Sequence, residues 1–119
     1  MDNYEIEQTL LGKLIVNPDL LDKYSQLLHE DLFEYPFNKS TYHSIMLLKE
    51  KNRTIDILTV SKLIKGDDVI LNLSYMTDKA FDFTELITCI GILTEEFQKR
   101  TLSGIVHDVG NKLSNQDEL

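Results

Sequence analysis

This sequence of 119 residues has one cysteine, no tryptophan and no long apolar run. Its one cysteine, Cys89, cannot form a disulfide within the chain, so we expect a buried structural thiol in a reducing compartment. No apolar run approaches the roughly 20 residues that a membrane-spanning helix needs. The first five residues are acidic rather than basic, which is not typical of a secretory signal. These absences predict a cytoplasmic protein that does not contact a membrane.

Basic residues are also scarce. The chain has 12 lysines and arginines against 20 aspartates and glutamates, which gives a formal net charge of −8. Proteins that bind duplex DNA on their own normally have the opposite balance, because contacts to phosphate require lysine and arginine. The composition therefore disfavours direct, non-specific DNA binding and leaves only a local basic patch open.

The common motifs of catalysis and cofactor binding are absent too. There is no G-x-x-x-x-G-K-[ST] phosphate loop, and the five glycines do not cluster. No C-x-x-C or H-E-x-x-H spacing offers ligands for zinc. The three histidines lie in separate segments, and we expect them to be solvated surface side chains. We therefore predict no catalytic residue, no metal site and no cofactor in this chain.

What the sequence does contain is helical periodicity along almost its whole length. The predicted helices run from a cap at Asp2 or Asn3 to Pro18, from Pro18 to Leu28, from a cap near Asn38 or Ser40 to Asn52, and from a cap at Asp56 to Gly66. Residues 67–79 are predicted as a loop and a short helix, because a lone strand would have nothing to pair with. The pattern predicts an all-α fold, a compact bundle of short helices followed by one long C-terminal helix. Within this single domain we expect a helical head at 1–80, the long helix at 81–113, and a turn or linker start at 114–119.

The long helix, predicted from Phe83 to Leu113, carries two apolar stripes with the same 4-3-4 spacing. The first stripe is Leu86, Ile90, Leu93 and Phe97, and the second is Leu102, Val106, Val109 and Leu113. A step of five residues separates them and rotates the second stripe away from the first. Such a helix is about 45 Å long, whereas the remaining chain forms a body about 25–30 Å across. We therefore expect the far end to overhang the head and contact a partner.

The residues predicted to make this partner contact are Leu102, Ile105, Val106, Val109 and Leu113. The alternative is that the helix breaks at residues 99–101 and folds back onto the core. No proline or capping pair marks a break there, so one continuous helix is the preferred interpretation.

Five basic residues gather near the third and fourth predicted helices: Lys49, Lys51, Arg53, Lys62 and Lys65. One interpretation is a weak contact with single-stranded nucleic acid, which would show a steep dependence on salt. The other is a set of solubilising lysines, which the negative net charge favours.

Several short motifs resemble, in order, the N-terminal domain of bacterial replicative helicases of the DnaB family. The opening Glu5-Ile6-Glu7-Gln8-Thr9-Leu10-Leu11-Gly12-Lys13-Leu14-Ile15 is similar to the family's E-x-E-Q-x-(V/L)-L-G-x-(L/I)-(L/I) helix. Similar segments follow at residues 17–22, 27–33, 42–45 and 55–60. The sequence departs from the family where Asn52-Arg53 replaces the glycine that usually ends the third helix. It also lacks the glycine pair of the G-G-x-x-Y-L segment at residues 71–76, which keeps its aromatic Tyr75.

The resemblance implies a non-catalytic domain made of a helical head and a helical hairpin, of which this chain supplies the first helix. In the family, hairpins pair domains into dimers, and three dimers form a collar on the hexameric motor. The collar docks primase and influences how the ring handles single-stranded DNA, while ATP-dependent helicase activity belongs to the motor downstream. The implied partners are thus further copies of the chain, primase, and single-stranded DNA indirectly through the ring. Two alternatives remain, the helicase-binding domain of a primase and a stand-alone helical module for protein interaction or weak single-strand binding.

Overall fold

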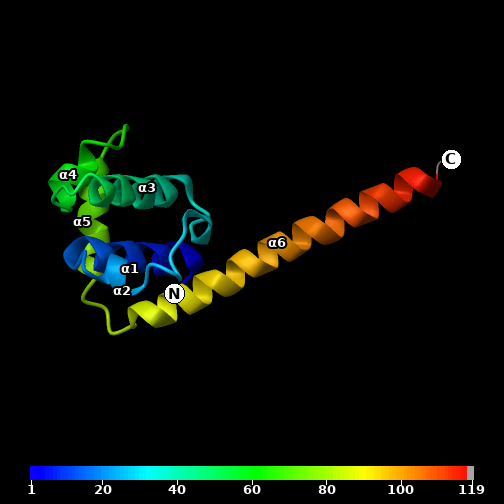
Figure 1. The fold of residues 1–119 in the computed structure, drawn as a ribbon, viewed down its shortest axis with the longest axis horizontal. Coiled ribbons are helices and arrows are strands. Elements are labelled where there is room, and N and C mark those ends of the chain that lie inside the picture. The colour runs from blue at the N-terminus through cyan, green and yellow to red at the C-terminus, as the bar shows by residue number, and fades with distance from the viewer. Residues whose placement is uncertain (118–119) are drawn as a thin grey trace.

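The structure, a computed structural model, describes the backbone of residues 1–117 and the side chains of residues 1–104. This part of the chain contains helices and no strand, which confirms the all-α prediction (Figure 1). The elements in order are α1 (Asn3–Val16), α2 (Leu20–Lys23), the 3-10 helix η1 (Glu30–Leu32), α3 (Pro36–Glu50), α4 (Ile57–Ser61), α5 (Val69–Lys79) and α6 (Leu86–Asp117).

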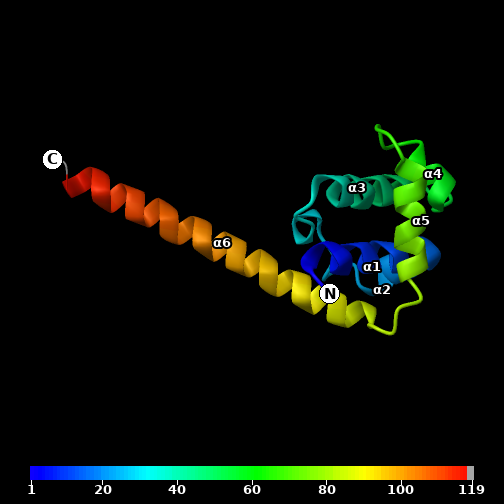
Figure 2. The same ribbon diagram turned by 180° about the vertical axis from the view of Figure 1, so that it is seen from behind.

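Helix α1 forms the centre of the head. Its residues Leu10, Leu11 and Leu14 are fully buried, and it packs against α3, α5 and α6. Figures 1 and 2 show α5 crossing one end of α1, with α4 beside it. The crossing is close at Gly12, where a β carbon would collide with the backbone carbonyl of Met76 on α5. Glycine at this position therefore lets the two helix backbones come together.

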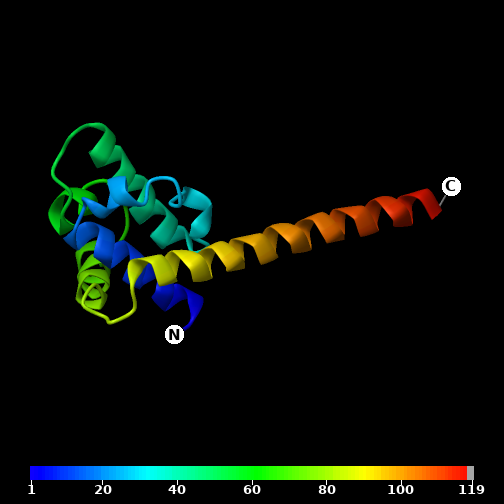
Figure 3. The ribbon, with the colours of Figure 1, turned by 60° about the horizontal axis from the view of Figure 1, so that its bottom comes forward.

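Helix α6 leaves the head as one continuous rod. Its first stripe packs on the head, with Leu86, Ile90 and Leu93 all buried. Beyond this stripe the helix projects past the end of the head at which α1 begins (Figures 1 and 3), and the molecule measures 58 × 30 × 25 Å. The prediction of an unbroken, overhanging helix is confirmed, and the alternative in which the helix folds back is wrong.

The ends of α5 and α6 differ from the predicted ones. Helix α6 begins at Leu86 rather than Phe83, because the Asp82 carboxylate accepts a 2.8 Å hydrogen bond from the Thr84 N–H and holds the chain in a turn. It continues to Asp117, past the predicted end at Leu113. Helix α5 is a full helix of 11 residues, longer than the short one predicted.

The second and fourth helices are shorter than their apolar patterns predict. Helix α2 ends at Lys23, and residues up to Leu27 form turns instead of a helix that reaches Leu28. Helix α4 begins at the predicted cap, where the Asp56 carboxylate accepts from the Thr59 N–H at 2.8 Å. It ends at Ser61, so Leu63 lies outside the helix with 44% of its surface exposed.

Candidate functional site

Helix α6 makes its last described contacts with the head through Arg100. The Nη2 of Arg100 donates a hydrogen bond of 3.0 Å to the Asp31 carbonyl. Its Nη1 lies 3.6 Å from Oε2 of Glu34, and the guanidinium lies over the Phe97 ring, 6.0 Å from its centroid. Phe97 in turn meets the His29 ring edge to face at 5.3 Å. Together these contacts fix the direction in which α6 leaves the head.

The predicted partner surface begins directly after this anchor. Leu102 is 62% exposed, as the rotation between the two stripes predicts. The other four predicted contact residues, Ile105, Val106, Val109 and Leu113, lie outside the residues whose side chains the structure describes. Their backbone belongs to α6, and their role as a contact surface stays a prediction.

The structure brings three of the five predicted nucleic-acid contacts to one groove and places the other two elsewhere. Lys51, Arg53 and Lys62 line a groove of about 260 Å³ between the end of α3 and α4. Its remaining lining residues are Leu47, Leu48, Thr59 and Leu63. Lys49 instead pairs with Asp22, Nζ to Oδ1 at 2.8 Å, and Lys65 does not line the groove. We call the seven lining residues the α3–α4 groove: Leu47, Leu48, Lys51, Arg53, Thr59, Lys62 and Leu63.

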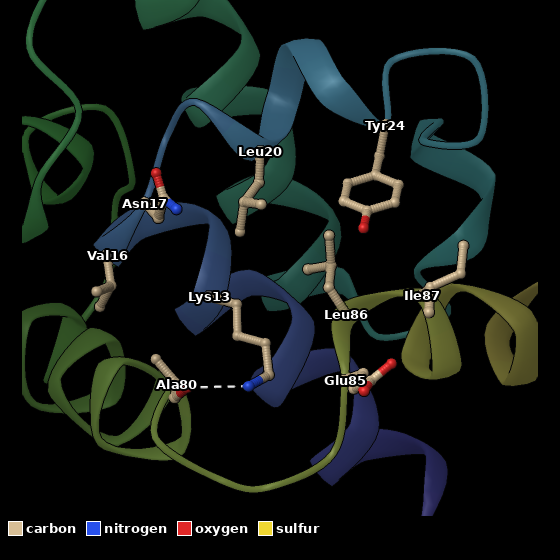
Figure 4. A pocket seen from close by; sticks show the side chains of 9 residues that line it. All are labelled: Lys13, Val16, Asn17, Leu20, Tyr24, Ala80, Glu85, Leu86 and Ile87. Carbon is tan, nitrogen blue, oxygen red and sulfur yellow. Dashed lines mark hydrogen bonds between the residues drawn. The ribbon is translucent and has the colours of Figure 1, made fainter.

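A second hollow, of about 360 Å³, lies between α1, α2 and the start of α6 (Figure 4). Lys13 is the only basic residue among those that line this hollow. It donates hydrogen bonds to the carbonyls of Ala80 at 2.9 Å and Asp82 at 3.0 Å. These bonds tie the loop between α5 and α6 to α1. Lys13 therefore has a structural role here, and the apolar side chains of Leu20 and Leu86 form much of the wall.

Among the described residues one carboxylate is deeply buried, that of Glu7 on α1, which is 1% exposed. It accepts hydrogen bonds from the backbone N–H of Glu34 at 3.1 Å, the backbone N–H of Tyr35 at 3.5 Å, and Nδ2 of Asn38 at 3.2 Å. Burial raises the pKa of Glu7 above its ordinary value of 4.5, although these hydrogen bonds oppose the rise. The N–H groups of Glu34 and Tyr35 precede α3, and the Asn38 amide lies in its first turn, so Glu7 holds the segment that leads into that helix.

Sequence patterns predict neither the Glu7 contacts nor the Arg100 contacts. Tyr35, the residue before α3, makes no side-chain cap, but the backbone donors to Glu7 precede the helix, so the missing cap is no signal for Glu7. Arg100 falls between the two stripes, where nothing in the apolar pattern marks it.

Other chemistry is limited in the part of the chain that the structure describes. Cys89 is fully buried, as predicted, and burial raises the pKa of its thiol. No group of three histidine, cysteine or acidic side chains is placed to hold a metal ion among the described residues. None of the helices searched within those residues is both long and apolar enough to cross a membrane.

The described surface thus offers a projecting helix and a groove rather than a reactive centre. A model of the family described as "DnaB-like helicase N terminal domain" matches residues 1–97 of this sequence. The chain belongs to this family. The matched residues comprise the head and the part of α6 that packs on it.

Curated relatives of this DnaB-like domain are replicative helicases. "Replicative DNA helicase DnaB" of Rickettsia conorii is 26% identical over 125 residues, which cover 95% of this chain and 24% of the relative. "Replicative DNA helicase DnaC" of Bacillus subtilis is 28% identical over 81 residues, covering 66% of this chain and 18% of the relative. The DnaB of Rhodothermus marinus is 24% identical over 114 residues, covering 89% and 12%. The chain therefore spans about a quarter or less of the length of these relatives.

Proposed function

We propose that this chain is the non-catalytic N-terminal domain of a replicative DNA helicase. In this proposal it mediates assembly of the helicase ring and docks primase during DNA replication. The observation that supports it most directly is the course of α6, which runs on past Arg100 to Asp117 and away from the head (Figure 1). Where a helix projects from its own domain, no residue of that domain can bury its apolar stripe. In this proposal a second copy of the chain buries it.

The energetic reason is the apolar character of the second stripe. Burying a leucine or valine side chain stabilises a protein by about 1.5–3 kcal/mol relative to leaving it in water. The stripe of Leu102, Val106, Val109 and Leu113, with Ile105 beside it, would lose this stabilisation in an isolated monomer. We propose that these residues pair with the same helix of a second copy. The region 81–113, in which α6 begins at Leu86, then supplies the first helix of a hairpin, beside a head formed by residues 1–80.

The resemblance of the chain to helicases bears on the proposed partner. A match to the helicase N-terminal domain favours this side of the primase–helicase contact over the alternative of a primase's own helicase-binding domain. Single-stranded DNA is a partner only through the ring. A pull-down with purified primase and, separately, with a DnaB-type helicase distinguishes the two, because a helicase N-terminal domain retains the primase.

The assembly proposal is tested by the double substitution Val106→Glu/Val109→Glu. We expect the unmodified chain to be a dimer or larger and the variant to be a monomer in light scattering coupled to size-exclusion chromatography. The control is Asn111→Glu/Asn115→Glu, which adds the same charge at positions that helical periodicity places opposite the stripe. The control is expected to keep the oligomer. An unmodified oligomer in the Val106/Val109 variant, with helix content retained by circular dichroism, would contradict the proposal.

A further inference from the structure

The α3–α4 groove combines positive charge with apolar side chains on a strongly acidic protein. Lys51, Arg53 and Lys62 contribute the charge, and no aspartate or glutamate is among the lining residues. None of these three makes an ion pair with an acidic group in the described part of the chain, whereas Lys39, Lys49, Lys99 and Arg100 each do. With a net charge of −8 over the whole chain, this concentration of positive charge is a local exception.

The end of α3 holds two of these cations in fixed positions. Asn52 adopts a left-handed conformation with φ of 55°. The N–H of Arg53 donates to the Leu48 carbonyl at 2.9 Å, and the N–H of Asn52 donates to the Lys49 carbonyl at 3.0 Å. These two bonds are the pair that defines a Schellman helix ending, in which asparagine can stand in for the usual glycine. The backbone at Lys51 and Arg53 is therefore set before any partner arrives.

The opposite wall is also fixed. The capping box of Asp56 and Thr59 holds the start of α4 through two reciprocal hydrogen bonds of 2.8 and 3.0 Å. The pKa of Asp56 is lowered mainly by the Thr59 N–H, and the positive charge of Lys62 lowers it further. Asp56 thus offsets part of the Lys62 charge, which leaves Lys51 and Arg53 as the principal cations of the groove.

The apolar lining decides what kind of ligand fits. Proteins that bind single strands stack bases on aromatic side chains, and this groove is lined by Leu47, Leu48 and Leu63 with no aromatic residue. Its volume of about 260 Å³ is just below the range of about 300–1,000 Å³ that is typical of small-molecule sites. An apolar side chain of a protein segment suits such a groove better than a nucleotide or a free metabolite.

We propose that the α3–α4 groove docks an acidic segment of a partner protein that carries a leucine-like side chain. The apolar side chain inserts beside Leu47 and Leu63, and flanking carboxylates pair with Lys51 and Arg53. This inference deepens the proposed function, since it rests on the head docking another protein. The groove lies between the end of α3 and α4, and these elements are at the end of the head opposite to the projecting part of α6 (Figures 1 and 2), so the two surfaces can be disabled separately.

The test measures binding of labelled peptides to the full chain by fluorescence anisotropy. The probe is a peptide of about four helical turns, with glutamates and with two leucines four residues apart. Its counterparts replace the glutamates by lysines or the leucines by serines, and an oligothymidine is the nucleic-acid probe. We expect only the acidic, leucine-bearing peptide to bind, and more weakly as salt rises, because the charges lie at the rim of the groove.

Two pairs of variants assign the binding to the groove. Lys51→Glu/Arg53→Glu is expected to weaken the acidic peptide about tenfold or more. Its matched control, Lys23→Glu/Lys65→Glu, changes the charge equally at exposed lysines outside the groove and is expected to bind nearly as well as the unmodified chain. Leu63→Ser is expected to weaken binding, whereas Leu58→Ser, at an exposed leucine that does not line the groove, is not.

Several results would overturn the inference. They are equal binding by the two charge variants, equal binding by the two leucine variants, binding of oligothymidine in place of the peptide, or binding of neither probe. Circular dichroism and the oligomeric state of each variant show that it is folded. If peptide binding fails while Val106→Glu/Val109→Glu still yields a monomer, the groove inference alone is wrong. If that α6 variant stays oligomeric while the groove binds as expected, the assembly proposal is the one that fails.

Discussion

The side-chain amide of Asn38 donates a hydrogen bond of 3.2 Å to the carboxylate of Glu7, and this contact joins the first turn of α3 to the middle of α1. Both side chains are buried. Oδ1 of Asn38 is buried and has no hydrogen-bond partner among the described residues. The bond from Nδ2 to Glu7 is therefore the only hydrogen bond of this amide among those residues. Removal of Glu7 would leave the amide and two backbone N–H groups without an acceptor.

Substitution of Glu7 by alanine is therefore expected to destabilise the head substantially. A buried donor left without an acceptor costs about 1–3 kcal/mol, and three donors share this carboxylate. We expect a loss of at least about 2 kcal/mol in the free energy of unfolding, measured by urea denaturation. The control is Glu50→Ala at the exposed last residue of α3, which should change the stability little. Equal losses in both variants would show that Glu7 does not stabilise the segment that leads into α3.

Glu7 also makes the stability depend on pH in a definite direction. Because burial raises its pKa in the folded state above 4.5, the folded chain holds this proton more tightly than the unfolded chain does. The stabilisation from this difference is complete below pH 4.5 and is lost as the pH rises through the raised pKa. Glu7→Gln, which cannot ionise, is expected to remove this contribution. Urea denaturation of both chains between pH 4 and 7 measures this effect. As the pH rises, the unmodified chain should lose stability relative to the Glu7→Gln variant; a gain relative to that variant would contradict the raised pKa.

Arg100 is expected to control how firmly α6 is held where it leaves the head. Arg100→Ala removes the hydrogen bond to Asp31, the ion pair with Glu34 and the contact with the Phe97 ring. We expect a loss of about 1 kcal/mol, since each contact is partly exposed, and faster amide hydrogen exchange around residues 97–102.

The neighbouring Lys99 provides the control for Arg100. Its side chain is largely exposed and pairs with Glu96, on its own helix, at 3.6 Å. Lys99→Ala should leave both stability and amide exchange nearly unchanged. If exchange in this segment responds to Lys99→Ala as strongly as to Arg100→Ala, the anchor assigned to Arg100 is not specific.

Two glycines in helices are expected to respond in opposite ways to alanine. Gly12→Ala places a methyl group against the Met76 carbonyl, so α1 and α5 must separate; we expect a loss of about 1–3 kcal/mol. Gly91→Ala meets no atom within 4 Å and should stabilise α6 by up to about 1 kcal/mol through helix propensity. Thermal and urea denaturation of the two variants measure both signs. A neutral Gly12→Ala would mean that the helix crossing tolerates a side chain.

Features set by neighbouring residues were predictable from the sequence. The starts of α1 and α4 follow from Asp2 and Asp56, each of which accepts a hydrogen bond from the backbone three residues ahead. The first stripe of α6 follows from spacing alone, with Leu86, Ile90 and Leu93 buried, and Leu102 of the second stripe is exposed.

Features set by distant residues were not predictable in the same way. The segment that leads into α3 is held by Glu7, whose hydrogen-bond partners lie 27 to 31 positions later in the chain. The basic cluster near residues 49–65 loses Lys49 because Asp22 lies close to it only in the folded chain. Charge and spacing were enough to suggest a basic site, but the leucines that line it became adjacent to the cations only through the packing of α3 against α4.

The rod of α6 gives the anchor at Arg100 a mechanical consequence. The helix extends about 25 Å from Arg100 to Asp117 at ~1.5 Å per residue. A tilt of about 10° at the anchor therefore displaces the tip of the helix by about 4 Å. Helix α6 therefore acts as a lever that is held at the Arg100 guanidinium, so a small rotation of the head moves the far end of the helix by several ångströms.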